Sequence, residues 1–509
     1  MFFKKLSKAP ARPQVFLGSP EAEAEATVHS RVSLADVYED FHNLLPELSG
    51  EKFIVVGRKG AGKSAFAEYV CLRAREEPNL FAHFVRASEF QIEKAIQFAQ
   101  QVDVAVESET FFIWLIYTNI LRIFVENAAI ADDKNYELLR QFLRKNSGYI
   151  NIKDYEIKSL VEKHGFDVSI EQFKRFFRAT TNRNVEIKSE RAPYYKLLPH
   201  LEEVVVKVLS SRFEIENGNS YALFFDDLDT WFSVNNKESA DSLMSLIRAC
   251  RRVNNDIFGK NGIHAKAIIL IRDDIEAYLA KKYADSAKMF SSYSCRINWY
   301  QEEYAGKVHQ ENELNLKKFI NVRIGYAFKR AGLEYNRHDP WESLVANHGD
   351  RSTFKQIVNQ TLFRPRDILL IFKPLESGKF EFPLSRQSVN SLIDVYADEL
   401  AKEVKNELSS FYSELQVNNI FLALSEISKS DHYYDDALRV IDECCNDVAA
   451  PELLEHLFDR SIIGTVDEYN RFWFKCRQRP GESNELKLDK SQRIVVQYGI
   501  KAYTARRYG

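Results

Sequence analysis

Short apolar-rich runs and longer stretches with a helical period alternate along the chain. Apolar runs of about four to eight residues are typical of buried strands, whereas apolar residues that recur every three or four positions predict a helix with one buried face. Because helical stretches separate successive apolar runs, the pattern predicts an α/β core with a mostly parallel sheet. The runs are residues 53–56, 81–86, 221–225, 267–272 and 294–299.

A large helical insertion is predicted between the second and third runs. Residues 90–210 carry mainly the helical period, and they exceed what a minimal crossover needs. Within them, residues 173–196 hold seven Lys or Arg against two Glu, interleaved with Phe and Tyr. Cations neutralise phosphate and aromatic rings stack on bases, so this segment suits a nucleic acid or a phosphorylated partner. An exposed amphipathic helix followed by a loop is the simpler interpretation, and we favour it.

Two further parts follow the last apolar run. Residues 301–400 carry helical patterns and predict a lid, and helical patterns continue over residues 400–465. Aromatic-rich strand patterns follow at residues 469–477 and 493–498, with a Pro-Gly turn signal between them at residues 480–484. Helices followed by such a hairpin resemble a winged helix, so we expect a winged-helix-like domain at this end of the chain.

The first residues of the chain predict an arm followed by one helix. An acidic alternation at Glu21, Glu23 and Glu25 is interpreted as a solvated helix face. Ser33 is the predicted N-cap of a helix whose apolar positions, at helical spacing, are Leu34, Val37, Phe41 and Leu44. The predicted domains are an N-terminal arm and helix (1–49), a core with the helical insertion (50–300), a helical lid (301–400) and a helical, winged-helix-like domain (401–509).

Residues 53–66, FIVVGRKGAGKSAF, carry the clearest chemistry. A strand pattern feeds the sequence GxxxxGK[ST], which predicts a phosphate-binding loop followed by a helix. Its glycines let successive backbone N–H groups point at one anion, and the helix adds the positive end of its dipole. Lys63 is predicted to reach the β- and γ-phosphates, and Ser64 to hold Mg²⁺. The predicted nucleotide-binding residues are Gly57, Arg58, Lys59, Gly60, Ala61, Gly62, Lys63, Ser64 and Ala65.

Two adjacent carboxylates end the apolar run at residues 221–225. Asp226 is placed to hold Mg²⁺ together with Ser64, and Asp227 to orient or deprotonate the attacking water. Like charges raise each other's pKa, and a bound cation relieves that cost. A solvated strand-to-helix turn is the alternative interpretation of the pair, and a helix N-cap is the favoured interpretation of Asp229.

Three segments resemble the additional-strand P-loop ATPases, and within them the bacterial STAND-like and KAP-like branches related to AAA+ proteins. The segments are GRKGAGKS, LFFDDLDTW and AIILIRDD. The resemblance implies ATP and Mg²⁺ as cofactors, and a strand between the two motif strands that ends in a polar sensor residue, here Arg272. It also implies that the later segment RPRD carries a second sensor arginine, Arg366, to the γ-phosphate. An ordinary structural ion pair is the alternative for either arginine.

The chain departs from the commonest pattern of this family at one position. The usual catalytic Glu is replaced by Asp227, one methylene shorter, so we expect ATP hydrolysis to be slow. The predicted catalytic residues are Lys63, Asp227, Arg272 and Arg366, and the predicted metal ligands are Ser64 and Asp226.

Composition limits the other possibilities. The chain has 509 residues, of which 45% are hydrophobic, so two or three packed domains are expected. Its net charge of -3 gives no bulk attraction to nucleic acid or anionic lipid. Positive charge is concentrated at residues 471–507, with ten Lys or Arg against three Asp or Glu, so DNA contact is expected there if anywhere.

Little else in the sequence predicts a second site or a membrane. The six cysteines are scattered without a CxxC pair, which predicts reduced structural thiols, and the histidines are isolated. The first residues lack the apolar stretch of a signal peptide. The most hydrophobic stretch, residues 111–125, is interrupted by Asn119 and Arg122 and falls short of a membrane span. We therefore expect a cytoplasmic protein without membrane contact.

Three functions are compatible with these patterns. The favoured one is an ATP-driven oligomeric regulator or switch; the family resemblance implies a role in a bacterial conflict system, such as antiphage defence, with a separate effector protein. The second is a DNA-loading ATPase similar to origin initiators, which the basic C-terminal segment supports. The third is a scaffold that binds ATP without hydrolysing it, which Asp227 in place of Glu supports.

Overall fold

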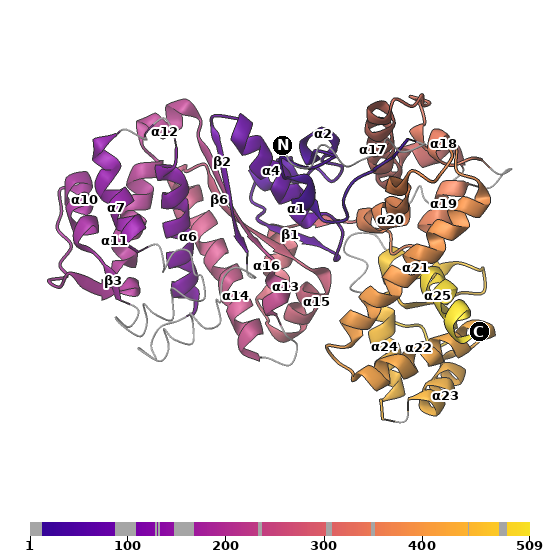
Figure 1. Cartoon of the computed structure of the whole chain (residues 1–509). Coiled ribbons are helices and arrows are strands. Elements are labelled where there is room, and N and C mark those ends of the chain that lie inside the picture. Colours follow the sequence, from indigo (N-terminus) through magenta and orange to yellow (C-terminus); the bar gives the residue numbers. More distant parts are fainter. Residues whose placement is uncertain are drawn as a thin grey trace. The chain divides into compact units, whose positions relative to one another are not determined.

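The chain forms two compact units, drawn in Figure 1. The sheet unit comprises His42–Arg58 and Lys63–Arg296, and the helical unit comprises Met1–Phe41, Lys59–Gly62 and Ile297–Gly509. The computed structural model describes residues 13–86, 108–127, 130, 133–146, 167–232, 237–301, 308–347, 352–445, 447–477 and 486–509.

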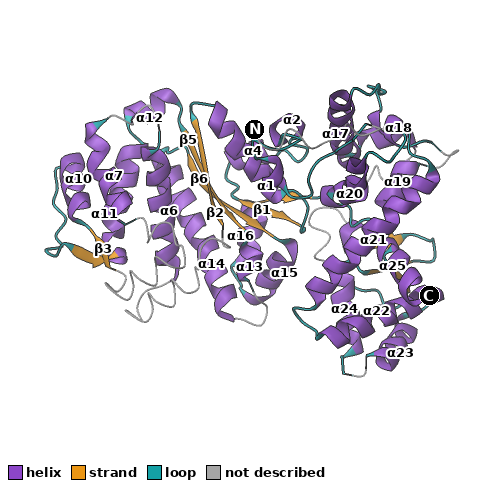
Figure 2. Ribbon diagram, in the orientation of Figure 1, coloured by secondary structure: helices purple, strands orange, loops and turns teal. Residues whose placement is uncertain are grey.

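A five-stranded sheet forms the centre of the sheet unit (Figure 2). Its strand order is β2-β5-β6-β1-β7, and the pairs β2/β5, β5/β6 and β1/β6 are parallel. The strands are β1 (Ile54–Gly57), β2 (Leu80–Arg86), β5 (Ser220–Asp226), β6 (Ala265–Ile271) and β7 (Ser294–Ile297). The predicted α/β core with a mostly parallel sheet is therefore confirmed. Strand β6 lies between the two motif strands, β1 and β5, as the family resemblance implies.

Burial explains why these runs became strands. The residues of β1 are all buried, and β5 and β6 are nearly so, because a central strand of a parallel sheet is covered on both faces. Strand β2 lies at the edge, and only its Val85 is fully buried. The parallel register brings the carboxyl ends of the strands to one edge of the sheet, with Val56 opposite Ile271 and Arg86 opposite Asp226.

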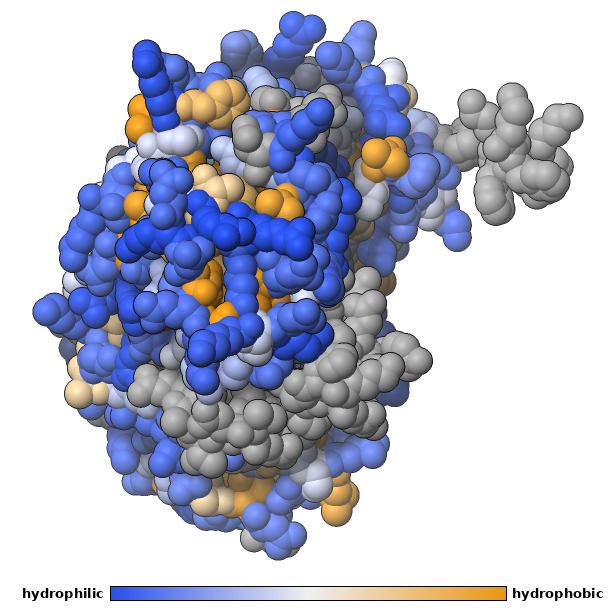
Figure 3. All heavy atoms as spheres, turned by 90° about the vertical axis from the view of Figure 1, so that its left-hand side faces the viewer, coloured by the Kyte–Doolittle hydropathy of each residue, from blue (hydrophilic) through white to orange (hydrophobic). Residues whose placement is uncertain are grey.

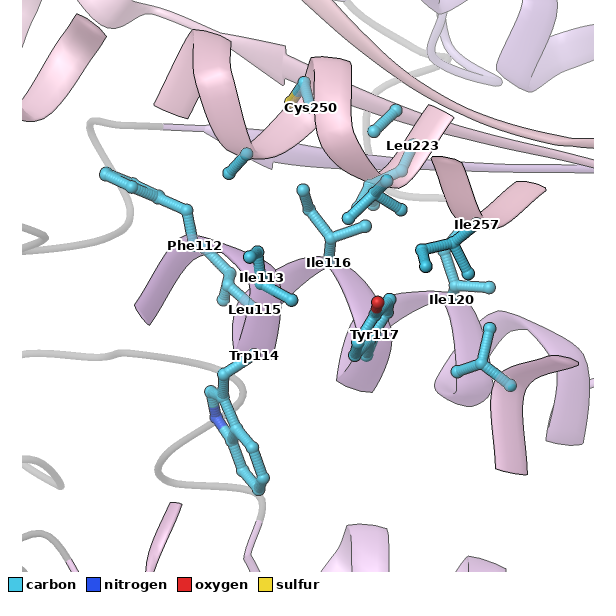
Figure 4. Close-up of a cluster of buried hydrophobic side chains, with 14 of the residues drawn as sticks. Phe112, Ile113, Trp114, Leu115, Ile116, Tyr117, Ile120, Leu223, Cys250 and Ile257 are labelled. Carbon is cyan, nitrogen blue, oxygen red and sulfur yellow. The ribbon is translucent and has the colours of Figure 1, made fainter. Parts of the chain in front are cut away.

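Helix α6 (Ser108–Val125) is the largest apolar element of the sheet unit. It is long and apolar enough to cross a membrane, but 72% of its apolar window is buried. It packs against α11 (Tyr194–Leu209), α14 (Lys237–Arg251) and β5. Figure 4 shows Ile116 on the side of α6 that faces Leu223 and Cys250, and Trp114 on the opposite side. The sequence predicted that residues 111–125 fall short of a span, whereas α6 is long and apolar enough by composition, and it is its burial that makes it a core helix in this structure.

The insertion between β2 and β5 is mainly helical, as predicted. Besides α6 and α11 it contains α7 (Glu137–Lys145), α10 (Glu171–Thr181) and α12 (Arg212–Asn217). An antiparallel pair of short strands, β3 (Asp167–Ser169) and β4 (Arg191–Pro193), was not predicted. Residues 90–107 of the predicted insertion lie outside the described residues.

The basic segment 173–196 has the simpler of its two interpretations. Phe173, Phe176 and Phe177 of α10 are at most 2% exposed, so these rings belong to the core and cannot stack on bases. Arg175 pairs with Glu171, and Arg183 pairs with Glu203. Figure 3 looks onto the side of the molecule that carries α7, α10 and α11, and this face is largely hydrophilic with small apolar patches. The segment is an amphipathic helix followed by a loop, which leads into β4 and the start of α11.

Further helices of the sheet unit surround its strands in the part of the chain that the structure describes. They are α4 (Lys63–Glu76), α13 (Leu228–Trp231), α15 (Asp273–Lys282) and α16 (Ser286–Tyr293). A π-helical segment, Arg252–Phe258, follows α14. Within it, the Asn254 side chain donates to the Ala267 carbonyl (2.8 Å) and accepts from the Ala267 N–H (2.9 Å), which ties the segment to β6.

The prediction of one helix from Ser33 to Leu44 is wrong. Two short helices stand there, α2 (Leu34–Val37) and α3 (Leu44–Ser49). Tyr38 is extended and Asn43 is left-handed (φ 54°), so the helical hydrogen bonds cannot continue between them. Before them lies α1 (Ala22–Glu25).

The prediction that the acidic alternation is solvated fails at Glu25. This carboxylate is 2% exposed and forms a bidentate ion pair with Arg323, at 2.7 and 2.8 Å. Val15 and Leu17 are buried as well, so the N-terminal segment is packed into the helical unit on both sides of Glu21.

Helices make up most of the helical unit. Besides α1 and α2, the described helices are α17 (Asn315–Ala331), α18 (Pro340–Leu344), α19 (Thr353–Val358), α20 (Pro365–Phe372), α21 (Arg386–Leu408), α22 (Glu414–Lys429), α23 (Tyr434–Cys444), α24 (Ala450–Asp459) and α25 (Tyr498–Tyr508). Helix α21 runs through position 400, where the sequence predicted the junction between the lid and the C-terminal domain.

The C-terminal strands differ from those predicted. A three-stranded antiparallel sheet has the order β10-β8-β9, and its strands are β8 (Ile463–Val466), β9 (Phe472–Trp473) and β10 (Arg493–Val496). Strand β8 lies in the stretch that was predicted to be helical, and β10 pairs with β8 instead of forming a hairpin with the 469–477 segment. The strand predicted to reach Tyr498 ends at Val496, because the Gln497 side chain caps α25 by accepting from the Ile500 N–H. The predicted turn at 480–484 lies outside the described residues.

Candidate nucleotide-binding site

The predicted phosphate-binding loop connects β1 to α4. Gly57 is the last residue of β1, and Lys63, Ser64 and Ala65 open α4. Between them, Gly60 and Gly62 have positive φ values of 74° and 102°, which residues with a Cβ rarely adopt. The first turn of a helix leaves its N–H groups without helical partners and carries the positive end of the dipole. The loop is therefore built to receive an anion.

Lys63 is bent back over its own loop. Its Nζ donates to the carbonyl oxygens of Gly57 (2.8 Å) and Arg58 (3.1 Å). Burial lowers the pKa of Lys63, and the nearby carboxylates Asp226 and Asp273 oppose that effect. A phosphate group would offer this ammonium a charged acceptor in place of two neutral carbonyls, and charged hydrogen bonds are about twice as strong.

Asp226 and Ser64 lie side by side. Asp226 is 4% exposed at the end of β5, and its Oδ1 accepts a hydrogen bond from the Asp227 N–H (2.8 Å). Its Oδ2 is buried and has no hydrogen-bond partner within the described part of the chain. Burial raises the pKa of Asp226, whereas hydrogen bonding from Ser64 and from the Asp227 N–H lowers it. This buried oxygen and the Ser64 hydroxyl are oxygen ligands of the kind that Mg²⁺ prefers.

The backbone conformation of Asp227 was not predicted from the sequence. Its φ is 58°, in the left-handed region, and it occupies the N-cap position of α13 without a side-chain cap. A non-glycine residue in this region is strained, and such strain is common at functional sites. The favoured prediction that Asp229 is the N-cap is therefore wrong, because Asp229 lies one residue inside α13.

Arg272 directly follows β6, at the start of α15. It forms a bidentate ion pair with Asp274, with Nε–Oδ1 at 2.9 Å and Nη2–Oδ2 at 2.6 Å. Its Nη1 also lies 3.3 Å from Asp229 Oδ2. Arg272 and Asp229 both affect the pKa of Lys63, so the sheet brings these charges to the lysine of the loop.

Arg366 lies in the first turn of α20, against the tip of the loop. A Cβ built on Gly60 would stand 3.1 Å from Arg366 Cδ and 3.2 Å from its Cβ. The guanidinium pairs with Glu21 through Nη2 at 2.5 Å, and its Nε is buried without a hydrogen-bond partner in the described residues. Both predicted sensor arginines are thus engaged by carboxylates in this structure.

Sequence patterns gave no role to Arg364 and Trp299, two residues of the helical unit that donate to carbonyls of the loop. Arg364 donates to the Lys59 carbonyl (3.2 Å) and forms ion pairs with Asp367 and Glu403. The Trp299 indole N–H donates to the Ala61 carbonyl (2.8 Å). Only the presence of Arg364 in the RPRD segment could have drawn attention to it, since the other contacts join residues far apart in the sequence.

The cations of residues 471–507 are less available than their number predicts. Several pair with carboxylates from outside that segment, so its local excess of positive charge is largely compensated. The pairs are Arg471–Asp467, Lys475–Asp459, Arg493–Asp431, Arg506–Asp394 and Arg506–Asp398.

Comparison with known proteins gives distant structural similarities. No protein-family model and no curated protein matches the chain. The structure is similar to that of the ORC2 protein of Aeropyrum pernix in ADPNP–ADP complexes, with 13% identity over 98% of each chain and a TM-score of 0.33. It is similar to Cdc6p from Pyrobaculum aerophilum, with 10% identity over 95% of this chain and 98% of that chain and a TM-score of 0.29. It is also similar to Drosophila ORC bound to DNA, with 9% identity over 92% and 94% of the two chains and a TM-score of 0.23.

Proposed function

We propose that this chain is a Mg²⁺-dependent, ATP-binding and ATP-hydrolysing switch. One observation carries the proposal: a glycine-containing loop leads from a buried strand into a helix, and Ser64 lies beside Asp226, whose buried Oδ2 has no hydrogen-bond partner among the described residues. This is the arrangement in which a phosphate and a divalent cation satisfy both the loop N–H groups and the buried carboxylate.

Residues of the loop and of the end of β5 are proposed to have separate roles in phosphoryl transfer. Ser64 and Asp226 would hold Mg²⁺, which supplies neutralising charge to the β- and γ-phosphates. Lys63 leaves the carbonyls of Gly57 and Arg58 to bind the same phosphates. Asp227, whose side chain does not cap α13, would orient or deprotonate the attacking water.

The two sensor arginines must exchange partners to take part. Arg272 would leave Asp274, and Arg366 would leave Glu21, before either reaches the γ-phosphate. Partly exposed ion pairs of this kind are worth less than about 1 kcal/mol, so a phosphate can compete with them. The exchange of partners by these two arginines would then depend on the γ-phosphate, so the ATP-bound and ADP-bound states would differ in their ion pairs.

The test is ATP binding and phosphate release by the full chain and two variants. Lys63→Ala is expected to weaken ATP binding about 10- to 100-fold, the cost of losing a charged hydrogen bond. Asp227→Asn is expected to keep binding and lower turnover by about 10²- to 10⁴-fold. Lys260→Ala, at an exposed pair with Asp256, is the matched control. Normal turnover in Lys63→Ala would refute the proposal, and binding without any turnover would leave ATP as a structural ligand of a scaffold.

A DNA-coupled ATPase is the second candidate. Helices α22, α23 and α24 precede β8 and β10, and His432, between α22 and α23, bridges to Ile494 of β10. This order of helices and strands supports a winged-helix-like domain. Tyr469 is 70% exposed and stacked against Arg471 on the connection between β8 and β9, where a contact to a base or phosphate is accessible.

The candidates are separated by duplex binding at two salt concentrations. Reversing the charge of Arg506 and Arg507 is expected to weaken DNA binding and flatten its salt dependence if this domain binds DNA. Absence of duplex binding by the unaltered chain would leave the domain as a packing module. A homo-oligomer, a partner effector and a role in antiphage defence stay expectations of the family resemblance, and ATP-dependent change in mass by light scattering tests the first.

A further inference from the structure

We infer that Trp299 and Arg364 are positioning residues that aim the phosphate-binding N–H groups of the loop. The inference rests on the proposed function and adds to it two residues that hydrogen-bond to carbonyl oxygens of the loop. The two side chains are donors to two carbonyls of the loop, those of Ala61 and Lys59.

A trans peptide links each held carbonyl to the N–H of the next residue. Because the peptide is planar and trans, the C=O and the following N–H point in opposite directions. Holding the Lys59 carbonyl toward Arg364 therefore turns the Gly60 N–H the other way, and holding the Ala61 carbonyl toward Trp299 does the same for the Gly62 N–H. Two alternate N–H groups are aimed without any contact to the nucleotide.

Arg364 is fixed firmly enough for this role. Its side chain is 4% exposed, and all five of its N–H groups have acceptors. Nε and Nη2 bond Asp367, Nη1 and Nη2 bond Glu403, and Nη1 bonds the Lys59 carbonyl. Glu403 also lies 3.9 Å from Lys59 Nζ, so the same carboxylate holds both the guanidinium and the side chain of the loop residue.

Trp299 is fixed by aromatic packing. Its ring is 9% exposed and makes edge contacts with Phe41 (5.8 Å between centroids) and Phe319 (5.6 Å). Rotation of the ring would break both contacts, so the direction of its N–H is set by the core of the helical unit. The loop carbonyl follows that direction.

Trp299→Phe tests the inference because it removes the N–H donor and keeps an aromatic ring. The dissociation constants of ATP and ADP with Mg²⁺ are expected to rise about fivefold, the effect of one buried hydrogen bond, with kcat unchanged. Trp341→Phe is the matched control: its indole N–H donates to Thr353 Oγ1 (3.0 Å), it is 2% exposed, and its ring packs against Phe354 and Phe372. The control is expected to lose similar stability and no affinity.

Arg364→Lys is a second variant, which keeps the buried positive charge but cannot hold two carboxylates and the carbonyl at once. It is expected to weaken both nucleotides more than Trp299→Phe does. Equal affinities of Trp299→Phe and Trp341→Phe for both nucleotides would overturn the inference while leaving the proposed function intact. Failure of the unaltered chain to bind either nucleotide would instead overturn the proposed function.

Discussion

Gly60 is the residue of the loop at which backbone freedom and space are both required. Its φ of 74° strains any residue with a Cβ, and that Cβ would press on Arg366. Gly60→Ala is therefore expected to shift the loop and weaken ATP binding by about tenfold, as measured by calorimetry. Gly218→Ala is the control, since Gly218 has a similar φ of 62°, lies outside the loop and has no atom within 4 Å of the added Cβ. An equal effect of both changes on affinity would contradict the steric explanation.

The ion pair between Glu21 and Arg366 engages the predicted sensor arginine, which would have to leave Glu21 to reach a nucleotide. Glu21→Gln removes the carboxylate that competes with a phosphate for Arg366, so ATP is expected to bind up to about fivefold more tightly. Glu376→Gln is the control, because it breaks another ion pair of the N-terminal segment, that with Arg31, and leaves Arg366 alone. Unchanged affinity in Glu21→Gln would mean that Arg366 does not meet the nucleotide.

At the scale of elements, the central strands were predictable and the short ones were not. Strands β1, β5 and β6 are buried on both faces, so their sequences had to be apolar throughout. Strand β8 escaped notice because its sequence, IGTV, is short and contains Gly464. That glycine is required, since a Cβ there would lie 2.6 Å from the Phe474 ring. Gly464 therefore weakened the apolar pattern that would have predicted β8, and the packing that requires this glycine cannot be read from the sequence.

Some features of the candidate site are marked by local sequence, and others depend on contacts between residues that are remote in sequence. The positions of Lys63 and Ser64 at the start of α4, and of Asp226 at the end of β5, were predictable because a loop motif and a strand end mark them locally. The contacts of Trp299 with Ala61 and of Arg364 with Glu403 join residues that are remote in sequence, and no periodicity marks them. The left-handed backbone of Asp227 was unpredictable too, since Asp occurs in many conformations at a strand end.

The π-helical segment after α14 supports a prediction about β6. Asn254 satisfies both backbone groups of Ala267, and these are buried. Asn254→Ala is expected to lower the free energy of unfolding by about 2–4 kcal/mol, because it leaves a donor and an acceptor unpaired. Urea denaturation followed by circular dichroism measures this. Asn217→Ala, which removes an exposed local hydrogen bond, should cost less than about 0.5 kcal/mol. Equal costs would show that water replaces the Asn254 contacts.

At the scale of the whole molecule, stability is expected to fall on mild acidification. Burial lowers the pKa of His456 from 6.5 to about 4, with a smaller effect of Arg460. The unfolded chain takes up a proton near pH 6.5 and the folded chain only near pH 4, so this contribution is complete above pH 6.5 and is lost as the pH falls toward 4. The melting temperature of His456→Gln should therefore decline less between pH 7.5 and 4.5 than that of the unaltered chain. The exposed His338→Gln should follow the unaltered chain, and parallel curves for all three would contradict the assignment.

The helical unit is assembled from segments that are remote in sequence, since Met1–Phe41 belongs with Ile297–Gly509. During synthesis Val15, Leu17 and Glu25 leave the ribosome long before Arg323, with which Glu25 pairs. The intervening residues of the sheet unit can begin to fold while this leading segment still waits for its site. An affinity tag or fusion placed before Val15 could disturb this segment before it packs. A tag placed after Tyr508 is therefore expected to give the higher yield of folded protein.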